Sequence, residues 1–347
     1  MSSLSRFLGD RARRRRVLAI GAAATALIAA GGASAQAATS TFLAGQLTSP
    51  FGAVQLGSGA TAGIWVADHA QGFCRLDPAT QAIIAATCNL SAGAQGGTSV
   101  NAAHTLAFVA DSGSKGQGVW RHSLSNAAGT RVRAQLLANR TATGQQLAPL
   151  RVDATAVSPG GNVYVGAKRS GDIFRITGAD NTTSPGILTD VGPAVGARKV
   201  LAMGFVGPDL WFVDGAGLEV LPNPDVNCPG VDCIAEPAGV DAVGGTTAVA
   251  GAPDIDPTTG AQRVDPVTGP VFNVYLGGIV GVSRYNTGDA TQDDAYFTSG
   301  TLPGGASTTI LNVSGISIDA ANNVLVTDDT SGGAQVFTGR AWSVTPQ

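Results

Sequence analysis

Charged side chains are scarce in this sequence, and their balance is acidic. Lys, Arg, Asp and Glu make up 13% of the 347 residues, and only two glutamates, three lysines and three histidines occur. The formal net charge is −3, and it becomes −8 when the first 35 residues, with six arginines and one aspartate, are set aside. Nucleic acids and anionic membranes need a basic footprint on the protein. Neither is therefore expected as a partner.

Long apolar runs and the motifs of common catalytic sites are also missing. The apolar stretch at residues 17–30 is shorter than the ~20 residues that a membrane-spanning helix needs, so we expect no stable membrane anchor. No Gly-x-Ser-x-Gly motif supports a serine hydrolase, and the Gly-rich stretches lack the lysine of a phosphate-binding loop. No motif of this kind assigns an activity.

The first 35 residues have the pattern of a signal peptide. A basic region with Arg11 and four consecutive arginines at 13–16 precedes the apolar stretch, and Ala33-Ser34-Ala35 forms a cleavage site before Gln36. Arg14-Arg15 also fits a twin-arginine signal, which is the alternative to Sec export. We expect residues 1–35 to be removed and the mature chain to reach the periplasm or the extracellular medium.

Four cysteines occur in two local pairs. Cys74 and Cys88 are separated by 13 residues, and Cys228 and Cys233 close a short loop. An even number of cysteines at close spacing in an exported chain predicts disulfides 74–88 and 228–233. A zinc site is the alternative, but zinc ligand pairs are usually spaced C-x₂₋₄-C and come with histidine partners. Cys74 has no such neighbour, whereas Cys228-x₄-Cys233 is at the edge of that range.

The main feature of the remaining sequence is a phrase that recurs six times. Each copy is a short apolar strand, a small polar turn and a second strand. Aligned on the aromatic residue of that second strand or its equivalent, the copies lie 43 to 64 residues apart, close to the ~40–50 of propeller repeats. The aligned residues are Trp65, Phe108, Tyr164, Trp211, Tyr275 and Leu325.

The repeat predicts an all-β fold, a six-bladed β-propeller of four-stranded antiparallel blades that fills residues 36–347 as one domain. The long interval before Tyr275 holds two turn phrases, at 256–260 and 265–269, which indicate an insertion. Residues 41–45 are expected to close the ring as the outer strand of blade six, because an unpaired edge would otherwise remain. The strands expected in the third copy are 154–158, 162–166, 173–177 and 187–189, and those in the last copy are 315–319, 323–328 and 335–337.

The phrase apolar-Trp/Tyr-Val-Ala-Asp, followed by a Gly-containing turn and apolar-x-Arg-Leu/Ile, resembles the repeat of NHL-type propellers. It is also similar to the gluconolactonase/SMP-30, strictosidine synthase and streptogramin-lyase propellers, over nearly the whole mature chain. In the enzymes the resemblance implies a metal site in the central channel. The gluconolactonase type places a Glu, an Asn and an Asp there, and neither Glu219 nor Glu236 aligns with the start of an inner strand. The peptidyl-amidoglycolate lyase type needs three widely spaced histidines, whereas His69, His104 and His122 all fall in the first two copies.

Charged residues that differ between copies are expected on one face of the propeller. The loops between second and third strands and the starts of the innermost strands surround one channel mouth, where a concave, polar-lined site can form. Strand-end aspartates also cap turns by accepting backbone N–H groups, which is the alternative for Asp68, Asp111 and Asp214. The candidate ligand-binding residues are Asp68, His69, Arg151, Asp153, Lys168, Arg169, Asp214 and Asp329.

The sequence is compatible with two functions. The first is an exported, non-catalytic propeller without a cofactor that binds a small molecule or a protein partner on this charged rim. The second is a metal-assisted lyase or lactonase with a divalent ion, Ca²⁺ or Mg²⁺, held by Asp68, His69, Asp153 and Asp214, where the ion would polarise a carbonyl or activate water. In that case Arg151 or Arg169 would hold the charge of the substrate.

Overall fold

The computed structural model describes residues 39–89, 96–111, 118–147, 150–192, 199–214, 217–228, 233, 235–238, 240, 245–330 and 338–345. The chain divides into two units, Met1–Ala37 and Ala38–Gln347. The first unit, with the expected signal peptide, lies outside the described residues, so the signal peptide stays a prediction. The second unit is described below.

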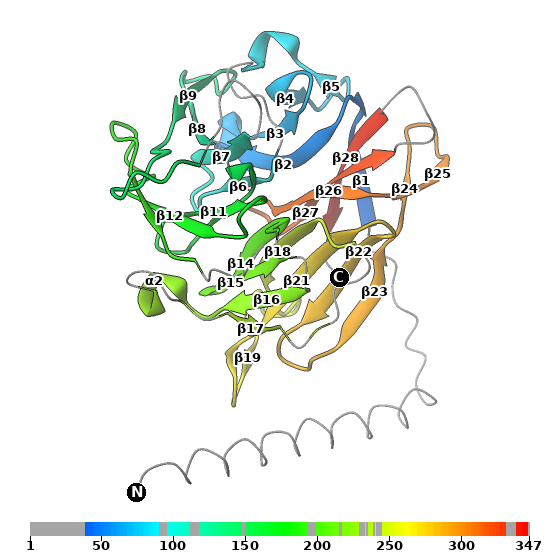
Figure 1. The fold of residues 1–347 in the computed structure, drawn as a ribbon. Coiled ribbons are helices and arrows are strands. Elements are labelled where there is room, and N and C mark those ends of the chain that lie inside the picture. Colours follow the sequence, from blue (N-terminus) through cyan, green and yellow to red (C-terminus); the bar gives the residue numbers. More distant parts are fainter. Residues whose placement is uncertain are drawn as a thin grey trace, which may run out of the picture. The chain divides into compact units, whose positions relative to one another are not determined.

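Six four-stranded antiparallel sheets, blades 1 to 6, follow one another around a common centre (Figure 1). From the innermost strand outward, blade 1 is β2 (Pro50–Leu56), β3 (Gly63–Asp68), β4 (Gly72–Asp77) and β5 (Ala82–Ile83). Blade 2 is β6 (Thr98–Val100), β7 (Leu106–Asp111), β8 (Gly118–Leu124) and β9 (Val132–Leu136), and blade 3 is β10 (Val152–Val157), β11 (Val163–Ala167), β12 (Ile173–Thr177) and β13 (Ile187–Asp190). Blade 4 is β14 (Ala202–Val206), β15 (Asp209–Val213), β16 (Leu218–Leu221) and β17 (Glu236–Pro237). Blade 5 is β18 (Ala248–Pro253), β21 (Phe272–Gly278), β22 (Gly281–Asn286) and β23 (Gln292–Phe297), and blade 6 is β26 (Val313–Ile318), β27 (Val324–Thr330), β28 (Thr338–Thr345) and β1 (Thr39–Leu47).

The ring is closed by the N-terminal strand, as the sequence predicts. β1 pairs antiparallel with β28 as the outer strand of blade 6, with Thr41 opposite Ser343 and Phe42 opposite Trp342. Each innermost strand contacts the innermost strand of the next blade, and β26 of blade 6 contacts β2 of blade 1. Closure leaves neither terminal blade with a missing strand, which removes the edge problem of an open sheet.

The core is divided into six apolar clusters, and each lies between two neighbouring blades. Successive residues of one strand point to opposite faces, so Val163 and Val165 pack toward blade 2 while Tyr164 packs toward blade 4. All three side chains are fully buried. A strand with both faces buried has a continuous apolar sequence, which explains the recurring phrase.

One strand of the last blade differs from its predicted position. The third strand was expected at residues 335–337, which lie outside the described residues; the described third strand is β28, which begins at Thr338. β27 continues to Thr330, beyond the expected end at Asp328, and Thr330 pairs with Thr338. The longer second strand requires its partner to begin later in the sequence.

The predicted insertion is present between the first two strands of blade 5. It contains a two-stranded hairpin, β19 (Val264–Asp265) and β20 (Gly269–Pro270). A second small hairpin, β24 (Ser299–Thr301) and β25 (Ser307–Thr309), links blades 5 and 6, and α2 (Pro224–Asn227) is a single helical turn in blade 4. Within the described residues, no helix has both the length and the apolarity to cross a membrane.

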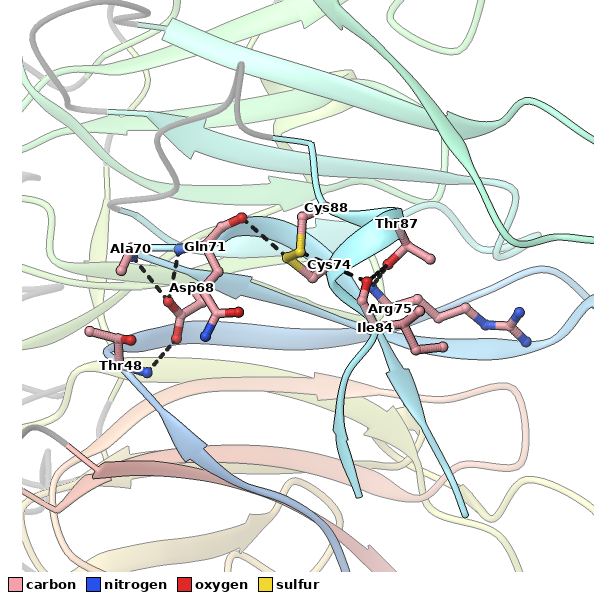
Figure 2. Close-up of a disulfide and its surroundings, with 9 residues drawn as sticks. All are labelled: Thr48, Asp68, Ala70, Gln71, Cys74, Arg75, Ile84, Thr87 and Cys88. Carbon is pink, nitrogen blue, oxygen red and sulfur yellow. Dashed lines mark hydrogen bonds between the residues drawn. A yellow bond between two sulfur atoms is a disulfide. The ribbon is translucent and has the colours of Figure 1, made fainter. Parts of the chain in front are cut away.

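Both predicted disulfides are confirmed, because Cys74 is bonded to Cys88 and Cys228 to Cys233. The first joins β4 to the segment after β5 at the outer side of blade 1 (Figure 2). Such bonds persist in oxidising compartments, so the pair favours an exported protein.

Candidate functional site at the channel mouth

A cavity of about 260 Å³ opens where the six innermost strands begin. All six blades contribute to its wall, which has both apolar and polar side chains. One lining residue from each blade, in order, is Phe51, Thr98, Asp153, Met203, Val249 and Ser314. A concave site with a few convergent polar groups is the usual form of a small-ligand pocket.

An ion pair in blade 3 supplies the charge in this cavity. Lys168 Nζ lies 2.6 Å from Asp153 Oδ2, with the lysine side chain 36% exposed and the aspartate side chain 12% exposed. The other oxygen, Asp153 Oδ1, is buried and accepts no hydrogen bond from the described residues, and the same holds for the hydroxyl of Thr98. Buried polar atoms usually have a hydrogen-bond partner, so a buried oxygen without one can accept from a ligand.

A β-bulge aims Asp153 into the cavity. In blades 1, 3 and 6 the pairing of the two inner strands shifts register close to the start of the innermost strand. Such bulges re-aim a side chain and occur often beside functional sites. The extra residues are Phe51, Asp153 and Ser314, and all three line the cavity. Asp153 is among the site residues predicted from the sequence, whereas Phe51 and Ser314 are not. Their only local signal is the glycine that follows each, Gly52 and Gly315.

The turn after β11 places Lys168 opposite the bulge. Lys168 N donates to the Arg151 carbonyl at 2.8 Å, and Arg169 N donates to the Leu150 carbonyl at 2.9 Å. Arg151 has a φ of 56°, so the chain turns sharply before β10. Arg151, Arg169 and Lys199 are exposed. Blade 3 and the segment leading into blade 4 therefore bring cationic side chains to this side of the mouth.

Asp68 lies at the same end of blade 1, but its carboxylate accepts hydrogen bonds from backbone N–H groups. It is fully buried, and its Oδ2 accepts from the N–H groups of Thr48 at 2.7 Å and Ser49 at 3.2 Å. Its Oδ1 accepts from Ala70 N at 3.0 Å and Gln71 N at 3.1 Å (Figure 2). Four backbone donors occupy the carboxylate, which is the turn-capping arrangement.

The remaining predicted site residues do not line the cavity. His69 is exposed beside the mouth, where its N–H donates to the Ser49 carbonyl at 3.0 Å and its ring lies 6.3 Å from the ring of Phe51. Asp214 is buried in blade 4 and accepts from Gly217 N at 3.2 Å. Asp329 belongs to β27, opposite Gly339, and its side chain lies outside the description.

The histidines do not converge. His104 is in the turn between β6 and β7, where its Nδ1 lies 3.3 Å from the Gln55 carbonyl. His122 is fully buried on β8, and its ring lies 4.5 Å from the ring of Phe73. Burial lowers the pKa of His122 to about 3. The three histidines therefore lie on separate elements of blades 1 and 2.

The donor set at the mouth does not fit a divalent ion. In the described part of the chain, no three His, Cys, Asp or Glu side chains are placed to share a metal, so Asp68, His69, Asp153 and Asp214 do not form the site considered for them. Asp153 is the one carboxylate among the described residues that line the cavity, and it is already paired with an ammonium group. Ca²⁺ and Mg²⁺ need several oxygen ligands.

Solved structures share this fold at low sequence identity. A gluconolactonase from Xanthomonas campestris matches with a TM-score of 0.55 and 14% identity over 90% of this chain and 93% of that one. A second protein, provisionally named a gluconolactonase, matches with a TM-score of 0.51 and 13% identity over 89% and 92% of the two chains. A calcium-binding protein, regucalcin, from Agrobacterium tumefaciens has a TM-score of 0.49 and 13% identity over 87% and 92%.

The two gluconolactonase matches confirm, at the level of the fold, the resemblance to gluconolactonase-type propellers that the repeat suggests. At 13–14% identity they carry no residue role to this chain. No protein-family model matches the sequence, and no curated protein matches it significantly.

Proposed function

We propose that this chain is an exported, non-catalytic propeller that binds a small hydroxy acid at the channel mouth. The observation that carries the proposal is the Asp153–Lys168 pair in a cavity of about 260 Å³, with Asp153 Oδ1 buried and without a hydrogen-bond donor among the described residues. A ligand hydroxyl can donate to Oδ1, and a ligand carboxylate can accept from Lys168 and the exposed cations of the rim. The two disulfides support export.

Calorimetric titration of the mature protein with gluconate tests this proposal, with glucose as the uncharged comparison. We expect saturable gluconate binding that Lys168→Met weakens about tenfold, because one charge-assisted hydrogen bond is lost. Asp153→Asn should weaken the binding of both gluconate and glucose. Arg131→Met removes an exposed cation from the outer turn of blade 2 and should weaken the binding of neither. Gluconate binding that ignores Lys168→Met, or no saturation at millimolar concentration, contradicts the proposal.

A metal-assisted lactonase is the second candidate, and the gluconolactonases that share the fold favour it. The side chains at the mouth do not favour a divalent ion, and this weakens the lactonase candidate. Metal analysis of the purified protein and hydrolysis of glucono-1,5-lactone separate the two functions. A tightly held channel metal, with hydrolysis lost in Asp153→Ala and His69→Ala, would replace the binding function by the catalytic one.

The mature protein recovered from the periplasm or medium should begin at Gln36.

A further inference from the structure

Four blades carry an arginine on the third strand, directly opposite the aromatic residue of the second strand. In blades 2 and 3 this arginine is buried and binds carbonyl groups of the next blade. The pairs are Trp65 with Arg75, Phe108 with Arg121, Tyr164 with Arg175, and Tyr275 with Arg284. The common position makes the four guanidinium groups comparable.

Arg121 shows the structural use of this position. It is 2% exposed, and its Nη1 donates to the carbonyls of Ala179 and Asn181, both at 2.6 Å, and of Ser184 at 3.1 Å. Arg175 repeats the arrangement one blade later, with Nη1 donating to the Cys228 carbonyl at 3.0 Å. In these blades the guanidinium joins neighbouring blades and has acceptors from the protein.

Arg75 in blade 1 has no such set of acceptors. Its guanidinium makes one long hydrogen bond, from Nη2 to the Ala62 carbonyl at 3.5 Å, and Nε is buried without an acceptor among the described residues. Figure 2 shows the Arg75 side chain extending away from the disulfide. It passes Gly63, where a Cβ would lie 2.6 Å from Nε. Leaving a buried donor unpaired is unfavourable, and an added acceptor would offset that cost.

The free guanidinium borders a cavity of about 460 Å³ between blade 1 and blade 6. The wall lies at the end of the propeller opposite the channel mouth, where it includes the turn after β26 and the strand ends of blade 1. The wall is mainly apolar, and it includes Leu43 of the closing strand β1 as well as Ile64 and Leu76 of blade 1. A cavity of this size and lining suits a small ligand with an apolar body and one polar group.

The acidic groups near this cavity do not neutralise Arg75. Asp319 lines the cavity, but its Oδ1 accepts from Ala321 N and Asn323 N, both at 2.8 Å, and its Oδ2 accepts from the Asn323 side chain. Asp77, in the turn after β4, accepts from Ala79 N at 2.9 Å. Neither carboxylate forms an ion pair with Arg75 in the described structure. After the hydrogen bond from Ala79 N, the Arg75 charge also contributes to the lowered pKa of Asp77, but among the described residues the guanidinium has no carboxylate in direct contact.

We propose that this cavity is a second binding site, which takes a small amphipathic carboxylate with an aliphatic chain. The carboxylate accepts hydrogen bonds from the Arg75 guanidinium, and the chain lies against Leu43, Ile64 and Leu76. Because Leu43 belongs to the closing strand and the other two to blade 1, the bound molecule bridges the two ends of the ring. Binding should therefore stabilise the closure as well as fill the cavity.

Calorimetric titration with octanoate, octanol and acetate tests this site. Octanoate should bind saturably to the mature protein, whereas octanol lacks the charge and acetate lacks the chain, so each should bind at least tenfold more weakly. Arg75→Met should weaken octanoate binding about tenfold or more. Gly63→Ala keeps the charge but displaces the guanidinium, so it should also weaken octanoate binding. Arg131→Met is the matched control and should leave binding unchanged.

Hydrogen exchange gives a second measurement, independent of affinity. Octanoate should slow exchange of the amides of β1 in the native protein and in Lys168→Met, and not in Arg75→Met. The proposal is overturned if octanoate does not saturate, if Arg75→Met binds it as the native protein does, or if Lys168→Met abolishes its binding. The last result would place octanoate at the channel mouth, and failure here would leave the gluconate titration unaffected.

Discussion

Charged side chains have different partners in two regions of the molecule: the packing between blades 2 and 3, and the channel mouth of blade 3. Between the blades, the buried Arg121 donates to three carbonyls of blade 3 and to Gln135 Oε1 at 2.5 Å. On the opposite face of the same strand, burial against Phe73 of blade 1 keeps His122 neutral. At the mouth, Asp153 has one oxygen bound to Lys168 and one without a partner among the described residues. Charge between blades stabilises the fold, whereas under the proposed function the charge at the mouth would bind a ligand.

The largest expected effect comes from removing the charge between the blades. Arg121→Met should lower the free energy of unfolding by about 4 kcal/mol, because several buried acceptors of blades 2 and 3 lose their donor at once. Lys168→Met, the same change at the channel mouth, should lower it by less than about 1 kcal/mol. Urea denaturation of both variants measures the difference. Equal losses would mean that the two regions do not differ as described.

How far the sequence predicts these two regions depends on whether the interaction is local. Blades, turns and the disulfide at Cys74 follow from strand periodicity and close spacing, and closure by β1 follows from the need to cover an edge. Asp68 belongs to this class, because two of its four donors, Ala70 and Gln71, lie within three residues. Its remaining donors, Thr48 and Ser49, come from the segment after β1.

Interactions that join different blades cannot be predicted from the sequence in the same way. The acceptors of Arg121 are carbonyls about 60 residues away, and any residue type could supply them. At the mouth, Asp153 and Lys168 could be selected because they flank predicted strands, but Phe51 and Ser314 enter only through a bulge. The cavity at Arg75 is equally hidden, because it depends on which acceptors one blade lacks relative to the others.

A smaller effect should appear when the solution is acidified. The pKa of His122 is lowered in the folded protein to about 3 from an ordinary 6.5, since burial disfavours the charged ring. The folded state therefore binds fewer protons, and the stability that is fully present above pH 6.5 is lost progressively as the pH falls toward 3. At pH 5 the loss from this one group should be about 2 kcal/mol.

Paired measurements isolate that loss. His122→Leu should remove about 2 kcal/mol of the change in unfolding free energy between pH 7.5 and pH 5, whereas His69→Gln, at an exposed histidine beside the mouth, should leave it in place. Urea titrations at the two pH values give both numbers. A pH dependence that is the same in His122→Leu and the native protein would show that the ring is not held neutral by its burial.

The smallest effect on stability is expected for the ion pair itself. Asp153 and Lys168 lie 2.6 Å apart, but the lysine side chain is 36% exposed, so solvent screens the attraction and the pair should couple by no more than about 0.5 kcal/mol. A double-mutant cycle of Asp153→Asn and Lys168→Met on urea stability measures that coupling. The same variants should still change gluconate affinity about tenfold, since binding makes use of the groups that folding leaves unsatisfied. A coupling above about 2 kcal/mol would instead make the pair part of the scaffold, as Arg121 is, and would remove the distinction between the mouth and the packing of the blades.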